Sequence, residues 1–162
     1  MSLKDDAVWL IFDPWNEQPK PCPCRKSDCD HYHGNYPDGY IDGINKYFAH
    51  KIDEYMQDIK TKYVVINSDE QEKHGLSDVF KDYNIIEHHE VPNITKDFES
   101  IVYTGFHHGR CTIDRSNSGA KEMKMNRHQP THLYFKTDLL CCLPGDSWIK
   151  MDKISQEYGE LI

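Results

Sequence analysis

The feature that most restricts the fold is a segment near the start of the chain in which every residue is apolar, Ala7-Val-Trp-Leu-Ile-Phe12. A strand with one face in water alternates apolar and polar residues, whereas a strand covered on both faces is apolar throughout. Shorter runs of the same character occur at 63–66 and 101–103. We therefore expect a parallel sheet that is buried between layers of helices.

Segments with helical periodicity alternate with these strands. Between Tyr40 and Ile59, apolar residues recur every three or four positions, which predicts an amphipathic helix. Further helices are expected near 79–80, over 111–125 and from Trp148 to Tyr158, and further strands at 84–86, 131–138 and 161–162. Alternation of this kind predicts an α/β fold, a three-layer Rossmann-like sandwich around a mostly parallel six-stranded sheet in the order 3-2-1-4-5-6.

Composition limits the classes of function. The chain has 162 residues and 38% hydrophobic content, which predicts a single domain over 1–162. A formal charge of -8 argues against binding to nucleic acid or to an anionic membrane, so we expect a small-molecule substrate. The N-terminus lacks an apolar signal core, and no run approaches the roughly 20 apolar residues of a membrane span. We expect a cytoplasmic protein whose cysteines are reduced and serve metal ligation or thiol chemistry.

Two chemically active residues follow neighbouring strands of the predicted sheet. Asp13 ends the first strand, and Cys111 follows the fourth strand after a turn from Gly105 to Gly109. In the order 3-2-1-4-5-6 these strands are adjacent at the point where the winding reverses, and ligands bind at their carboxyl ends. A helix that begins at Cys111 would favour the thiolate through its free N–H groups. The alternative is a buried cysteine with no reactivity.

The segment Gly105-Phe-His-His-Gly-Arg-Cys111 gives this arrangement a possible identity. Together with Asp13, Arg115, Gly119, Met123 and a fifth strand closed by Asp138, it resembles the isochorismatase-like cysteine hydrolases. The resemblance implies a six-stranded α/β fold and a homo-oligomer. It also implies that Asp13 is the general base and Cys111 the nucleophile. The backbone N–H groups of His107 and Cys111 would form an oxyanion hole beside a cis Phe106–His107 bond.

One part of the pattern is missing, because the family carries a lysine after strand 3 where this chain has Glu87-His-His-Glu90. Without help, a thiol of pKa about 8.5 is only a few per cent ionised at pH 7. A protonated His88 or His89 could replace the positive charge, or His107 or His108 could act as a base. The alternative for each histidine is a half-exposed loop residue.

A second group of candidate ligands lies in a loop expected at about 14–39, which is rich in Pro, Cys, His and Asp. Closely spaced thiols and imidazoles in a reduced protein are typical of zinc sites, and zinc would stabilise a loop with little to bury. The loop could also be unliganded and flexible, and in either case it could cover the crevice as a lid. The candidate metal ligands are Cys22, Cys24, Cys29, His31 and His33.

These observations lead to three hypotheses. The first is a hydrolase of a small amide, imide or vinyl ether, with Asp13, Cys111, His107 and His88 as catalytic residues. The second is a non-catalytic binding or regulatory protein of the same fold with a zinc-stabilised loop. The third is a zinc-dependent hydrolase that uses the loop at 14–39.

Overall fold

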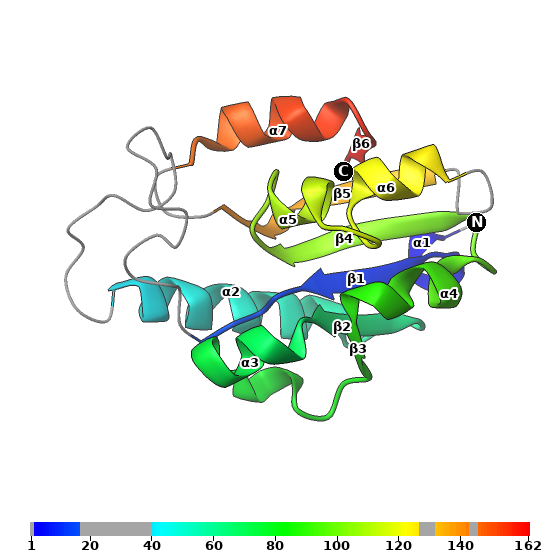
Figure 1. Ribbon diagram of the computed structural model, residues 1–162. Helices are drawn as coiled ribbons and strands as arrows, with labels where there is room; N and C mark the ends of the chain where they lie inside the picture. The colour runs from blue at the N-terminus through cyan, green and yellow to red at the C-terminus, as the bar shows by residue number, and fades with distance from the viewer. Residues whose placement is uncertain (1, 17–39, 127–131, 143–145) are drawn as a thin grey trace.

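The computed structural model describes residues 2–16, 40–126, 132–142 and 146–162, and these form one sheet with helices on both faces (Figure 1). All six strands are parallel, in the order β3-β2-β1-β4-β5-β6, so the predicted α/β class and strand order are confirmed. The strands are β1 (Val8–Phe12), β2 (Lys62–Ile66), β3 (Ile85–Glu87), β4 (Ser100–Phe106), β5 (His132–Cys141) and β6 (Glu160–Leu161).

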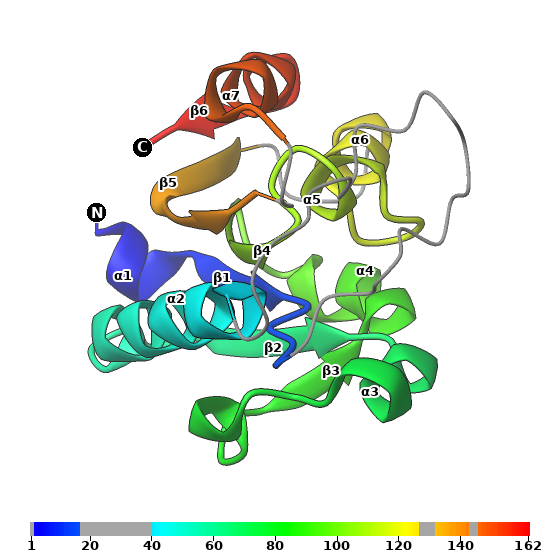
Figure 2. The same cartoon turned by 90° about the vertical axis from the view of Figure 1, so that its left-hand side faces the viewer.

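Helices lie on both faces of the sheet. Figure 2 shows α2 on one side of the sheet and α4, α5 and α6 on the other. The α-helices are α1 (Leu3–Asp6), α2 (Tyr40–Met56), α3 (Ser68–His74), α4 (Val91–Thr95), α5 (Cys111–Asp114), α6 (Ala120–Met125) and α7 (Trp148–Gln156). Two short 3₁₀ helices are η1 (Asp78–Phe80) and η2 (His88–Glu90). No described helix is both long enough and apolar enough to span a bilayer.

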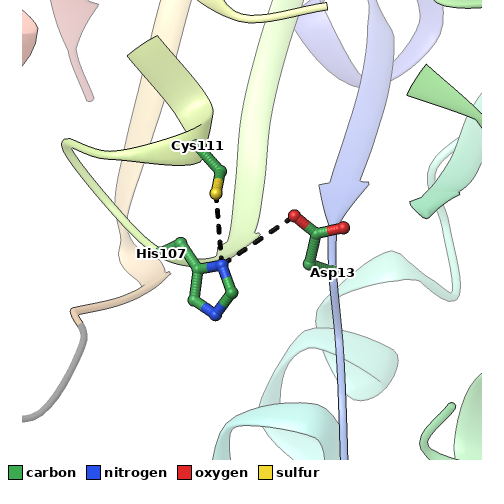
Figure 3. Close-up of side chains that lie close together, drawn as sticks. All are labelled: Asp13, His107 and Cys111. Atoms are coloured by element: carbon green, nitrogen blue, oxygen red, sulfur yellow. Dashed lines mark hydrogen bonds and ion pairs between the residues drawn. The ribbon is translucent and has the colours of Figure 1, made fainter. Parts of the chain in front are cut away.

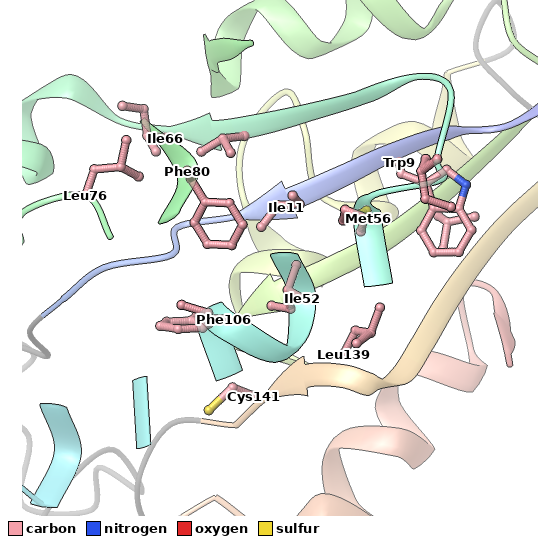
Figure 4. Packing of buried hydrophobic residues seen from close by; sticks show 14 of the residues in the cluster. Trp9, Ile11, Ile52, Met56, Ile66, Leu76, Phe80, Phe106, Leu139 and Cys141 are labelled. Carbon is pink, nitrogen blue, oxygen red and sulfur yellow. The ribbon is translucent and has the colours of Figure 1, made fainter. Parts of the chain in front are cut away.

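Strand β1 is apolar throughout because each of its faces meets a different hydrophobic layer. Trp9 and Ile11 point to the face covered by α2, where they join Ile52 and Met56 in one core (Figure 4). Leu10 and the other even-numbered residues of β1 point to the opposite face, in a core with residues of α4, α5 and α6. All five β1 residues are buried, which is what a fully apolar strand predicts.

The segment predicted as one helix over 111–125 contains two short helices, and this prediction was wrong. α5 ends after Asp114 because Arg115 is extended, with φ -60° and ψ 125°. Asn117 then has a positive φ of 71°, which a helix cannot accommodate. A Cβ at Gly119 would overlap the carbonyl of Ile113, so the chain folds back tightly before α6 begins. The turn brings residues 115–119 to the carboxyl edge of the sheet.

The fifth strand does not close at Asp138, as the sequence predicted, but continues to Cys141. A register shift against β4 accounts for the extra length. Tyr103 pairs with Phe135, whereas Gly105 pairs with Leu140. Of the intervening residues 136–139, the first three are not buried and include the polar Lys136 and Asp138, so their composition is typical of a strand end.

Parallel strands place their carboxyl ends at one edge of the sheet, and the residues that follow them gather there. Asp13 follows β1, His88 follows β3 and His107 follows β4. Asp13 and His107 both have positive φ, 46° and 64°, so the chain turns sharply as it leaves each strand. Gly105 has φ 106°, and a Cβ there would overlap the backbone N and O of Phe12. A glycine therefore lets β4 approach β1 closely just before the site.

Candidate active site at the carboxyl edge of the sheet

The structure brings Asp13, His107 and Cys111 together, and we call these three residues the thiol cluster. Nδ1 of His107 lies 3.3 Å from Sγ of Cys111 and 3.9 Å from Oδ2 of Asp13. Figure 3 shows the three side chains pointing toward one another from the end of β1, the turn after β4 and the start of α5. The sequence predicted that Asp13 and Cys111 meet at this edge, and His107 lies within reach of both.

A second histidine fixes the carboxylate of Asp13. The side chain of Asp13 is fully buried, and its Oδ1 accepts a hydrogen bond from Nε2 of His88 at 2.9 Å. Nδ1 of His88 is 2.6 Å from Oγ of Ser118, which is also buried. Among the described residues, Oδ2 of Asp13 has no hydrogen-bond partner. A buried carboxylate oxygen without a partner is costly, so this atom is a candidate for a functional contact.

Burial sets the protonation of the cluster. It raises the pKa of the Cys111 thiol to about 12, the charge of Asp13 adds to that shift, and Arg115 opposes it. Burial also lowers the pKa of His107 below its ordinary value, and Asp13 partly offsets this. At neutral pH the resting pair is therefore a thiol beside a neutral imidazole. A helix does begin at Cys111, as the sequence predicted, but α5 has only four residues, and desolvation of the partly buried thiol raises its pKa instead of lowering it.

The predicted histidines divide into two groups. His88 and His107 are in contact with Asp13 or Cys111, as described above. The side chain of His89 is 66% exposed and pairs with Glu87 outside the cluster. His108 points the other way, and its Nε2 lies 2.8 Å from Oδ1 of Asp152 on α7. Only one histidine of each adjacent pair therefore contacts Asp13 or Cys111.

The positive charge beside the thiol comes from Arg115. Lys96, the nearest lysine in sequence after strand 3, is exposed and bonds Asn93. Arg115 instead opposes the rise in the Cys111 pKa through its positive charge, and its Nη1 lies 3.4 Å from Oε1 of Glu70. Sequence reasoning missed this role because it depends on the break between α5 and α6. Ser118 was missed for the same reason.

A pocket of about 470 Å³ adjoins the cluster. It shares His88 and Arg115 with the surroundings of Asp13 and Cys111, and its lining is mostly polar. The lining residues are Ile66, Asn67, Glu87, His88, His89, Asp114, Arg115, Ser116 and Asn117. A small polar molecule would fit its volume and its hydrogen-bonding groups.

The thiol cluster also has the composition of a metal site. One ligand atom from each of Asp13, His107 and Cys111 lies within 4.8 Å of the other two, so the group could hold a metal ion. The ligands predicted from sequence, Cys22, Cys24, Cys29, His31 and His33, all lie outside the described residues. The group that could hold a metal ion in the described part of the chain is thus a different one from the group that the sequence suggested.

Comparisons with known proteins found no match to a family model, to a curated protein or to a solved structure. The resemblance to the isochorismatase-like hydrolases therefore stays a prediction.

Proposed function

We propose that this protein is a cysteine-dependent hydrolase of a small amide, imide or vinyl ether, in which Cys111 is the nucleophile and Asp13 the anionic part of the base. The observation that carries the proposal is the position of Nδ1 of His107, 3.3 Å from Sγ of Cys111 and 3.9 Å from Oδ2 of Asp13. A nucleophile within hydrogen-bond reach of a base, with a third group beside that base, is the general arrangement for activating a thiol.

The resting protonation states of Cys111 and His107 suit a mechanism in which the base removes the thiol proton during nucleophilic attack. A thiol with a raised pKa must lose its proton as the bond to substrate forms, and His107 is neutral and able to accept it. The imidazolium that results lies beside the carboxylate of Asp13, which stabilises the new charge. Asp13 thus acts as a base through His107, which takes the proton at Nδ1.

The residues that contact Asp13 and Cys111 support this role. His88 holds Oδ1 of Asp13, and Ser118 in turn contacts His88, so Oδ2 is left directed at His107. Arg115, near the sulfur, favours negative charge there. We assign His88 to positioning, since it contacts Asp13 and also lines the pocket of about 470 Å³.

For an amide, the proposed reaction passes through a thioester. Sγ attacks the carbonyl carbon while its proton passes to Nδ1 of His107. The carbon–nitrogen bond then breaks, and His107 returns the proton to the leaving nitrogen, which gives a thioester. Water adds to the thioester with its proton going to His107. Collapse of that adduct releases the acid and restores the thiol.

Alkylation of Cys111 by iodoacetamide at pH 7, followed by mass spectrometry of each cysteine, tests the proposal. We expect Cys111 to react faster than a free thiol of pKa about 8.5, despite its raised pKa, because a base assists it. Asp13→Asn is expected to slow this reaction. Cys142, a described cysteine outside the cluster, is the internal reference.

A rate for Cys111 no greater than that of a free thiol would contradict the hydrolase. It would favour the second hypothesis, a non-catalytic binding protein. If Cys111 does react rapidly, turnover should be sought with a panel of small amides, imides and vinyl ethers, and Cys111→Ser should abolish it. Loss of turnover on chelation, with the fold intact, would instead support the zinc-dependent hydrolase.

A further inference from the structure

The carboxylate of Asp13 is the acidic side chain in the described core that has a buried oxygen without a hydrogen-bond partner. Its side chain is 0% exposed, and one of its two oxygens has no hydrogen-bond partner among the described residues. Proteins rarely leave a buried carboxylate oxygen in this condition, because the cost of removing it from water is not recovered. The atom lies 3.9 Å from His107, so whatever completes its contacts would sit between these side chains.

A metal ion fits that position by size. With zinc bond lengths of about 2.3 Å to sulfur and about 2.0 Å to nitrogen or oxygen, the ligand atoms of a tetrahedral site are roughly 3.3 to 3.6 Å apart. The separation of Nδ1 and Sγ is 3.3 Å, and that of Nδ1 and Oδ2 is 3.9 Å. All three ligand atoms lie within 4.8 Å of one another. Closing the remaining gap requires side-chain shifts of about 1 Å or less.

The residues around Asp13 hold its carboxylate in place, as residues around metal ligands do. Metal-bound carboxylates are held by hydrogen bonds from a second layer of residues, which fixes their orientation. Here His88 holds Oδ1 of Asp13 and contacts Ser118, while Oδ2 stays directed toward His107. The carboxylate is therefore oriented before a ligand arrives.

We infer that Oδ2 of Asp13, Nδ1 of His107 and Sγ of Cys111 form a site for a thiophilic divalent cation of the zinc type. One sulfur, one imidazole nitrogen and one carboxylate oxygen favour zinc over magnesium or calcium, which take oxygen ligands. Three protein ligands leave a fourth position for water or a small molecule. Binding releases the thiol proton to solvent and leaves the sulfur as a metal-bound thiolate.

The inference does not rest on the proposed hydrolase, and the two make opposite demands on Cys111. A sulfur bound to zinc is not available to attack a carbonyl carbon. A zinc-type cation would therefore block alkylation of Cys111, and would inhibit a hydrolase that depends on it.

The test is titration with Co²⁺, whose thiolate complexes absorb strongly through a sulfur-to-metal charge-transfer band. The full chain would carry Cys22→Ser, Cys24→Ser and Cys29→Ser, so that thiols of the loop do not contribute. We expect one equivalent of Co²⁺ with this band, displaced by Zn²⁺. Cys111→Ser should remove the band, and the matched variant Cys142→Ser should retain it.

Absence of the band, or a band of equal intensity in the Cys111→Ser variant, would overturn the site. If the triple variant does not fold, the same comparison is made in the otherwise unaltered chain. There Cys111→Ser should lower the bound Co²⁺ by one equivalent, and no change would overturn the inference. Alkylation separates the two proposals: rapid labelling of Cys111 that Zn²⁺ does not block supports the hydrolase alone. Slow labelling of Cys111 in the metal-free protein, together with the Co²⁺ band, supports the metal site alone.

Discussion

His107 and His108 are adjacent residues of the same type, yet they serve two different regions of the molecule. His107 faces the thiol cluster, with Sγ of Cys111 at 3.3 Å and Oδ2 of Asp13 at 3.9 Å. His108 faces α7 and is hydrogen-bonded to Asp152 at 2.8 Å. Beside it, Arg110 makes two hydrogen bonds to Asp146, at 2.8 and 3.0 Å. We call the contacts of His108 and Arg110 with Asp152 and Asp146 the α7 contacts.

The two regions differ in how fully the carboxylate oxygens of their acidic residues are hydrogen-bonded. The α7 contacts include a bidentate pair of good geometry, which suits a structural tie between the turn and the C-terminal part of the chain. In the thiol cluster the acid keeps one oxygen without a hydrogen bond, whereas among the described α7 contacts the buried atom without a partner is Nδ1 of His108 and not an oxygen of an acid. Adjacent positions on one turn thus separate a structural role from a candidate chemical one.

The largest expected effect comes from changing the residue that supports both regions. Gly105 precedes both histidines, and a Cβ there would overlap the backbone of Phe12 in a region where φ is 106°. Gly105→Ala should lower the free energy of unfolding by about 4 kcal/mol or more, because backbone cannot move aside as a side-chain tip can. Urea denaturation measures this.

The control for that substitution is Gly43→Ala in α2, where nothing lies within 4 Å of the added Cβ. Alanine is a better helix former than glycine, so we expect stability to be unchanged or up to about 1 kcal/mol higher. Equal effects at the two glycines would show that the close approach of β4 to β1 is not a requirement of the fold.

Arg110→Ala removes one part of the α7 contacts, the two hydrogen bonds to Asp146, and no contact of the thiol cluster. The side chain of Asp146 is only 1% exposed, so its carboxylate would be left buried and unpaired. We expect a loss of about 3 kcal/mol in the free energy of unfolding, measured by denaturant titration. Lys81→Ala, which removes an exposed ion pair with Asp78, should cause no measurable loss. Similar results for the two variants would mean that the tie to α7 contributes little.

The same substitution at His107 and at His108 distinguishes the roles of the two histidines most directly. His107→Asn should slow the alkylation of Cys111 by about tenfold or more, because the base is lost. His108→Asn should change that rate by less than about twofold, and should lower stability by about 1 to 2 kcal/mol through the lost bond to Asp152. Rates and unfolding curves are measured on both variants. If both slow alkylation equally, the division of roles is incorrect.

The smallest effect expected is on the pH dependence of stability. Burial lowers the pKa of both His107 and His108 below the ordinary value of 6.5. The unfolded chain then binds more protons than the folded one just below that pH, so this contribution to stability is complete above pH 6.5 and is lost as the pH falls toward the folded values. His108→Asn should flatten the pH profile of the melting temperature below 6.5. An unchanged slope would indicate that His108 is not buried as a neutral group.

Much of the fold followed from the residues themselves. The apolar run of β1 predicted a strand covered on both faces, and the alternation of elements predicted the strand order. The end of β5 was missed because Lys136 and Asp138 lie in a part of the strand that is not buried. The break between α5 and α6 was missed because apolar spacing says nothing of the backbone reversal at 115–119.

The site was predictable to the extent that topology determines it. Parallel strands were enough to bring Asp13 and Cys111 to one edge. Burial and side-chain directions determine the remaining features, which are the contact of His88 with Asp13, the role of Arg115 and the raised pKa of Cys111. Such properties arise only when distant segments pack together, so a sequence does not display them directly.

The positive φ angles of Asp13 and His107 restrict what the chain can become. Left-handed backbone is readily adopted by glycine and tolerated by Asn, Asp and His, while β-branched and bulky residues avoid it. A library of variants selected only for folding should therefore enrich the same few residue types at positions 13 and 107 as one selected for chemistry. Retention of an acid and an imidazole there would not, by itself, reveal which pressure had acted.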